Sequence, residues 1–104
     1  MKRSRSHETS ITIDAPIADV WKAISEAGEL QRWLAKDMEV TPRVCGSYMA
    51  KWDDNPPWTL TVEVWDAPKH LQLVELEEGH RLLLDYYLES EGNATVLRVV
   101  QSGF

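Results

Sequence analysis

Asp85 has the most unusual surroundings of any acidic residue in this sequence, because it lies inside the apolar and aromatic run LLLDYY at positions 82–87. A carboxyl group held among leucines could serve as a general acid or base. Successive side chains of a strand point to opposite faces, however, so we expect Asp85 to point outward onto a solvated face. On this interpretation Asp85 is a surface acid.

The histidines and the cysteine form no catalytic constellation in the sequence. His70 and His80 each stand next to a predicted turn or hairpin, which indicates exposed polar side chains without partners for metal binding or proton transfer. Cys45 has no neighbouring basic cluster, so we interpret it as a small packed thiol. The run DDNPP at 53–57 predicts a solvated loop, because a cation loop needs several oxygen ligands at alternating spacing. We therefore expect no catalytic residue, no metal site and no cofactor.

Aromatic side chains are the remaining chemical signal, with five tryptophans and three tyrosines in 104 residues. Trp21 is predicted to belong to the core. For Trp33, Trp52 and Trp58 the sequence leaves core packing and ligand contact equally open, since pockets and cores share their composition.

The stretch 11–34 carries two of these aromatic side chains, Trp21 and Trp33. Residues 11–13 predict a strand, and Pro16 then marks the start of a helix. The apolar positions of that helix recur at helical spacing: Ile17, Val20, Trp21 and Ile24. Gly28 ends this helix, and a second, shorter helix is predicted to carry Trp33 toward the same core.

The rest of the chain predicts strands. Their ranges are 38–44, 46–52, 58–65, 71–77, 81–89 and 95–101, with a bulge or tight turn at 44–46. Links as short as 78–79 can join only antiparallel neighbours. Both faces of the last strands carry apolar residues, so something must cover the second face or leave it exposed. The sequence thus predicts an α+β fold, an antiparallel sheet of about six strands with two short helices after strand one.

The order of strand, IDAP, a helix with VW and a short helix with RWL resembles the START-like (SRPBCC) superfamily, and most closely its family named after the activator of the heat-shock protein 90 ATPase. The likeness continues through PRVCGSY at 42–48, VEVWDAPKHL at 62–71 and TVLRVVQSGF at 95–104. Cys45 departs from the first of two glycines that are usual there, and Gln101 from a frequent histidine. The resemblance implies a curved, helix-grip sheet over a cavity for apolar small molecules.

The resemblance also implies a function. We expect a non-catalytic domain that binds a hydrophobic small molecule or acts as a chaperone-accessory, stress-related protein; the alternative is a cyclase- or hydrolase-like enzyme that uses the same cavity. The residues expected to contact the ligand are Trp33, Met49, Trp52, Trp58, Leu60, Tyr86 and Gln101.

Members of that family continue into a long C-terminal helix gripped by the sheet, whereas nothing follows Phe104 here. We therefore expect a flexible arm at 1–7 and a START-like domain at 8–104 that is truncated at its C-terminus. Without the helix, Leu and Val side chains of the sheet should be bare over more area than soluble monomers tolerate. Self-association is the expected result, unless the chain is a fragment.

Composition narrows the possible partners. The net charge is -6, and the eleven Lys and Arg residues are dispersed among seventeen acids. Nucleic acids need a clustered basic face, so they are not expected as partners. No apolar run approaches the ~20 residues of a membrane span, and the N-terminus does not have the pattern of a secretory signal. We expect a cytoplasmic protein without membrane association, and a single cysteine excludes an internal disulfide.

Overall fold

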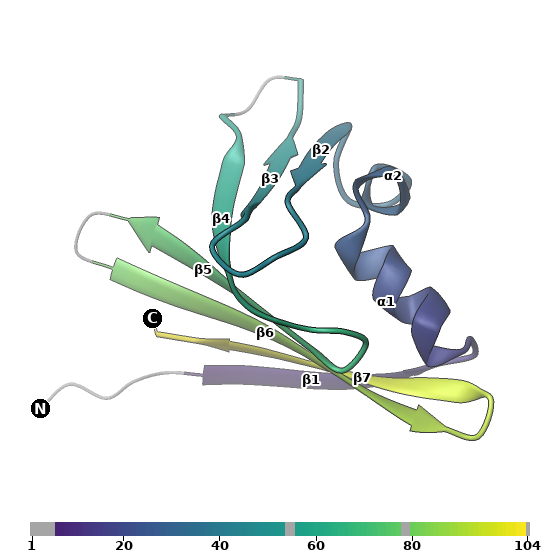
Figure 1. Cartoon of the computed structure of the whole chain (residues 1–104). Coiled ribbons are helices and arrows are strands. Elements are labelled where there is room, and N and C mark those ends of the chain that lie inside the picture. The colour runs from purple at the N-terminus through teal and green to yellow at the C-terminus, as the bar shows by residue number, and fades with distance from the viewer. Residues whose placement is uncertain (1–5, 54–55, 78–79, 104) are drawn as a thin grey trace, which may run out of the picture.

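The computed structural model describes residues 6–53, 56–77 and 80–103. These residues form one antiparallel sheet with the strand order β1-β7-β6-β5-β4-β3-β2. The strands are β1 (Ser6–Ile13), β2 (Asp37–Val40), β3 (Ser47–Lys51), β4 (Trp58–Asp66), β5 (His70–Glu77), β6 (His80–Glu91) and β7 (Ala94–Ser102). Two helices, α1 (Ile17–Ser25) and α2 (Ala27–Leu30), directly follow β1 (Figure 1). The predicted α+β fold is confirmed, with seven strands among the described residues where about six were expected.

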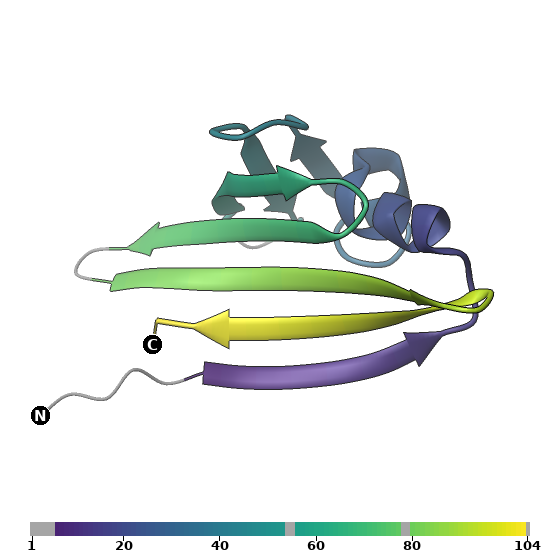
Figure 2. The same ribbon diagram turned by 60° about the horizontal axis from the view of Figure 1, so that its bottom comes forward.

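The sheet is bent into two parts. Figure 1 shows β2, β3 and β4 rising away from the other strands, with both helices on the same side, and Figure 2 shows β5, β6, β7 and β1 side by side in that order. The pairing of β4 with β5 shifts between Val62 and Val64, and such a bulge bends a strand and increases its twist. We call the side of the sheet that faces the helices the inner face, and the opposite side the outer face.

The core lies on the inner face, where α1 contacts β6 and β7. The apolar side of α1 buries Val20, Trp21 and Ile24. They belong to one core cluster with inner-face leucines, which are Leu71, Leu73, Leu84, Leu88 and Leu97. The expectation that the leucines of the sheet would be bare is therefore wrong for these five, because α1 and the bent strands cover them.

The second helix differs from its prediction. α2 is a single turn that buries Leu30, and Trp33 follows its end with 56% of its surface exposed. Trp33 is therefore not carried into the core. Its indole Nε1 donates a hydrogen bond to the Ala23 carbonyl at 2.9 Å, so the side chain is fixed on the surface beside α1.

Two contacts fasten α1 to the sheet. The Tyr48 hydroxyl on β3 donates a hydrogen bond to the Ile24 carbonyl at 2.8 Å. The Trp21 ring meets Trp65 of β4 edge-on, with centroids 5.3 Å apart and an interplanar angle of 80°. Burial, followed by the nearby Tyr86, raises the pKa of Tyr48 well above its ordinary value of 10.0. Tyr48 therefore keeps its proton, and its hydrogen bond, throughout the neutral range.

A tight turn before β3 confirms the prediction for 44–46, since the Gly46 amide donates to the Arg43 carbonyl at 2.9 Å. A Cβ at position 46 would collide with the Thr41 carbonyl oxygen, so only glycine fits there. Cys45 takes the left-handed conformation with φ of 69°, and its side chain is exposed. The interpretation of Cys45 as a packed thiol is therefore wrong.

The N-terminal boundary also differs. Ser6 and His7 pair with Ser102 and Gln101 of β7, so the end of the expected arm at 1–7 belongs to the sheet. The rest of that arm, Asp54 with Asn55 of the predicted loop, and the turn at 78–79 lie outside the described residues, as does the side chain of His80. In the described part of the chain no helix is long and apolar enough to cross a membrane.

Replacing Tyr48 with Phe removes the bond to Ile24 and should lower the free energy of unfolding by about 1 kcal/mol near neutral pH. Because the pKa of Tyr48 is raised in the folded state, its contribution is complete below about pH 10 and is lost as the pH rises further. The unfolding free energies of the parent and of Tyr48→Phe should therefore converge above about pH 10. Urea denaturation across this range checks both points, and a difference that is constant with pH would contradict them.

Candidate functional site

Most of the residues expected to contact a ligand face the inner side of the sheet. Trp58 and Leu60 alternate with outward residues on β4, and Tyr86 and Gln101 do so on β6 and β7. Leu60 is fully buried in the core, whereas Trp58 and Tyr86 are half-buried and Gln101 is exposed. Trp52 packs against the core just beyond β3.

The two remaining residues lie elsewhere. Met49 pairs with Glu39 and Thr59, on the opposite face of β3 from Tyr48. Trp33 lies on the surface beside α1. The structure therefore does not bring the seven residues together around one cavity.

A partly open strip remains on the inner face over β6, β7 and β1. We define the inner strip as Tyr86, Val99, Gln101 and Ile11. Tyr86 is paired with Val99, and Ile11 is 51% exposed. Burial raises the pKa of the Tyr86 phenol, so the hydroxyl stays neutral at physiological pH. The inner strip thus combines apolar Val99 and Ile11 with the neutral polar groups of Tyr86 and Gln101 beside the buried leucines, and Thr9 and His7 of β1 pair with Val99 and Gln101 on this face.

On the outer face, the structure brings together residues that sequence reasoning had kept apart. Asp85 does point away from the core leucines, as expected, but it is only 5% exposed. Its Oδ1 accepts a hydrogen bond from Gln72 Nε2 at 2.9 Å and lies 2.6 Å from His70 Nε2. The expectations of a solvated Asp85 and of a partnerless His70 are therefore both wrong.

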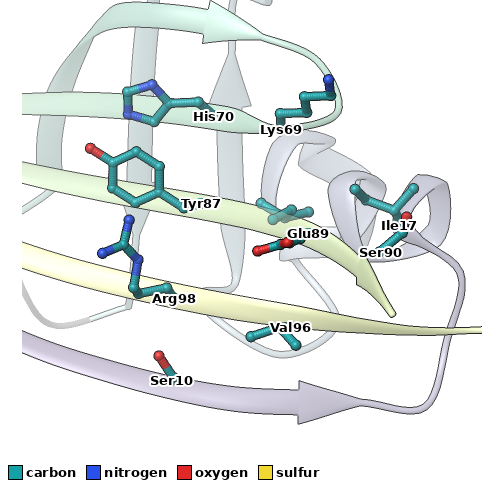
Figure 3. Close-up of a pocket in the computed structure, with 10 residues that line it drawn as sticks. Ser10, Ile17, Lys69, His70, Tyr87, Glu89, Ser90, Val96 and Arg98 are labelled. Atoms are coloured by element: carbon teal, nitrogen blue, oxygen red, sulfur yellow. The ribbon is translucent and has the colours of Figure 1, made fainter. Parts of the chain in front are cut away.

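A row of side chains continues from this pair across the outer face (Figure 3). The register places His70 of β5, Tyr87 of β6, Arg98 of β7 and Ser10 of β1 opposite one another. The His70 and Tyr87 rings are stacked, with centroids 4.3 Å apart and planes inclined by 13°. The Arg98 guanidinium carbon lies 4.6 Å from the Tyr87 ring centroid, within the range of a cation–π contact. We call His70, Tyr87, Arg98 and Ser10 the outer row.

The charges around Tyr87 act in opposite directions. Desolvation, and then the negative charge of Asp85, raise the pKa of the Tyr87 phenol above its ordinary value of 10.0, while Arg98 lowers it. Hydrogen bonding toward Asp85 adds to the rise, so the Tyr87 hydroxyl stays protonated and is directed to that carboxylate.

The outer row borders an open hollow with a volume of about 570 Å³. Its lining contains Lys69, Glu89 and Ser90 in addition to the outer row. Three apolar residues also line it: Val96, on the same face as Arg98, and Ile17 and the mostly buried Leu88, which pack toward α1 and the core. The volume falls within the range of small-molecule sites. A second hollow of about 350 Å³, beside Trp21 and Trp65, contains none of the expected ligand residues.

One sequence signal could have revealed the contact between His70 and Asp85, which we call the outer pair. Counting back from the predicted turn at 78–79 places Gln72 opposite Asp85, and His70 then stands on the same face, two residues before Gln72. The burial of Asp85 had no such signal, because it comes from side chains on neighbouring strands. Among the described residues, no group of three potential ligands could hold a metal ion.

Comparison with known proteins identifies the sequence family and the fold. The sequence profile of the family described as "Activator of Hsp90 ATPase homolog 1-like protein" matches residues 14–104. No functionally curated protein is detectably similar in sequence.

Solved structures share the fold at low sequence identity. Protein MLL2253 from Mesorhizobium loti has a TM-score of 0.85 and 22% identity over 96% of this chain and 77% of that chain. CalU16 from Micromonospora echinospora has a TM-score of 0.80 and 22% identity over 96% of this chain and 61% of that one. The Aha1 dimer from Colwellia psychrerythraea has a TM-score of 0.83 and 16% identity over 96% and 77% of the respective chains.

The outer pair should respond asymmetrically to mutation. His70→Ala leaves the buried Asp85 carboxylate without its histidine partner while the hydrogen bond from Gln72 remains, so we expect the free energy of unfolding to fall by about 1–3 kcal/mol. Asp85→Leu removes the buried charge itself and leaves His70, which is partly exposed, free to bind water. Asp85→Leu should therefore cost less than His70→Ala. Urea denaturation of the single and double variants measures the difference, and a larger cost for Asp85→Leu would show that the carboxylate is not the group at risk.

Proposed function

The chain belongs to the family of Activator of Hsp90 ATPase homolog 1-like proteins, and we propose that it is a non-catalytic binding domain that receives an apolar ligand on the inner face of its sheet. The START-like fold commonly serves ligand binding or cyclase-like roles, so the fold supports both a binder and an enzyme. The apolar character of the inner strip favours the binder.

One observation carries this proposal, the partial exposure of the inner strip. The leucines beside it are buried, whereas Ile11 remains 51% exposed and Tyr86 and Val99 are half-buried. An apolar ligand placed against these side chains would remove apolar surface from water at about 25 cal/mol per Å². Of the residues expected from the sequence, Tyr86 and Gln101 belong to this strip, and we include Trp58 and Trp52 as more distant inner contacts.

The family description suggests what the binding serves. We infer a chaperone-accessory role, in which the inner strip receives an apolar segment or small molecule connected with the chaperone cycle. An uncharged surface suits this role, because apolar contact needs no matching charge on the partner.

A second candidate, an enzyme, is favoured by one specific observation. His70 is oriented by a buried carboxylate, which is the arrangement that positions a general base in many hydrolases. The pair lies on the outer face, however, whereas the expected cavity lies on the inner face. An enzyme would therefore have to work at the outer hollow, and its turnover would distinguish it from a binder.

The neutral fluorescent probe N-phenyl-1-naphthylamine tests the inner strip. We expect saturable binding, and we expect Ile11→Glu to weaken it about tenfold or more, because the charge must be desolvated against the probe. Val44→Glu is a matched control, since Val44 is 54% exposed in the turn before β3. Fluorescence titration of the three proteins gives the dissociation constants. Equal weakening by both substitutions, or no saturable binding, would contradict the proposal.

We also propose that copies of the chain self-associate through the inner strip when no ligand occupies it. The Colwellia psychrerythraea neighbour is described as a dimer, and an exposed apolar strip is a suitable contact. Sedimentation equilibrium should show reversible association that Ile11→Glu weakens and Val44→Glu does not. A monomer at all concentrations would exclude this proposal while leaving the probe titration to judge ligand binding.

A further inference from the structure

We propose that the hollow beside the outer row is a second binding site, separate from the inner strip, and that it takes a small organic monocarboxylate with an apolar body. An oriented guanidinium, a lysine and three apolar residues line this one hollow (Figure 3).

Arg98 is held in place at the rim of the hollow by a chain of contacts. The Asp85 carboxylate lies 2.6 Å from His70 Nε2 and fixes that ring, which stacks on Tyr87. On the other side of Tyr87 in the row, the Arg98 guanidinium carbon lies 4.6 Å from the centroid of the Tyr87 ring. Each contact restricts the next side chain. A guanidinium that is already oriented loses less conformational entropy when a carboxylate binds.

The donors of Arg98 are left for a ligand. Its nearest acid is Glu8, whose Oε2 lies 3.6 Å from Nη1 in a largely exposed pair, and exposed pairs of this kind are worth little. Within the described ranges, neither Arg98 nor the Lys69 ammonium donates a side-chain hydrogen bond to the protein. Two cationic side chains therefore line one hollow in a chain whose net charge is -6.

The Glu89 carboxylate in the lining determines how much negative charge a bound anion can carry. Glu89 also lines the hollow, and its carboxylate opposes the accumulation of negative charge there. The lining itself has two cationic side chains and one carboxylate, and Glu8 beside Arg98 reduces the local positive charge further, so the site suits a single carboxylate better than a phosphate dianion. Arg98 matches a carboxylate with two parallel hydrogen bonds.

The apolar lining residues provide a place for the rest of the ligand. Val96 lies two residues before Arg98 on the same face of β7, and Ile17 and the edge of Leu88 also line the hollow. Ile17 begins α1, so this part of the lining lies where the helix meets the end of the sheet. A short alkyl or aryl group packed there would add apolar burial to the charge contact.

Sodium octanoate is the probe for this site, with octanol and octyl phosphate as comparisons at constant ionic strength. Backbone amide NMR titrations of the full chain should show saturable shifts at Lys69, Val96 and Arg98 with octanoate, and weaker or no binding of octanol. We expect octyl phosphate to bind less tightly than octanoate. Equal binding of octanol, tighter binding of octyl phosphate, or shifts confined to the inner strip would each overturn the proposal.

Charge substitutions give the sharper test, because their effects have opposite signs. Arg98→Gln and Lys69→Gln should each raise the dissociation constant of octanoate, the former about tenfold or more, whereas Glu89→Gln should lower it. Lys51→Gln, an exposed lysine on β3 outside the hollow, is the matched control and should change nothing. Octanoate affinity that is indifferent to Arg98→Gln, or that falls with Glu89→Gln, would show that the hollow does not bind the carboxylate as proposed.

Variants of Tyr87 test whether its ring positions Arg98 for ligand binding or only stabilises the fold. Tyr87→Phe keeps the ring on which Arg98 lies and should retain most of the affinity, whereas Tyr87→Leu removes it and should weaken octanoate binding toward the level of Arg98→Gln. Both variants should give well-dispersed amide spectra. Equal affinity of the two variants would contradict the positioning of Arg98 by the ring.

Discussion

The need to bury one face of the sheet is the constraint on which the rest of this structure depends. Leucines from β5, β6 and β7 occupy that face, and a flat sheet would leave them in water. These leucines are buried because the sheet bends at the irregular pairing of β4 with β5. The bend brings β2 and β3 over the inner face next to α1. The Tyr48 bond to Ile24 then joins the bent part of the sheet to the end of the helix.

This solution covers the inner face unevenly. The side formed by β4, β5 and β6 is closed by α1 and the bent strands, while Val99 and Ile11 on the side of β7 and β1 remain partly open. The same geometry therefore produces both the core and the strip that we interpret as a binding surface. The inner face thus holds the stabilising core at one end and the proposed binding surface at the other, and both are built on the same strands.

The outer face follows different physical rules. A buried carboxylate is a poor source of stability, because its desolvation offsets much of the attraction to its partners. Asp85 nevertheless keeps two polar partners and almost no exposure. Beside it, the His70 and Tyr87 rings are stacked and the Arg98 guanidinium lies over Tyr87, in order across three strands. Groups arranged at such a cost are more readily explained by positioning than by folding, since an apolar residue at 85 would pack with less penalty.

The sequence by itself determined the elements whose information is local. The apolar spacing after Pro16 defined α1, and the step at 44–46 defined the turn before β3; the family likeness followed from the same stretches. Alternation alone would place Val64 on the same face of β4 as Val62, but the bulge between them turns Val64 to the outer face. Only the tertiary structure decided how side chains on different strands meet. The burial of Asp85 depends on His70 and Gln72 from the neighbouring strand, and the exposure of Trp33 depends on where a one-turn helix ends. The first outcome is set by cross-strand register, about which the alternation of a single strand carries no information, and the second is set by packing at the end of α2.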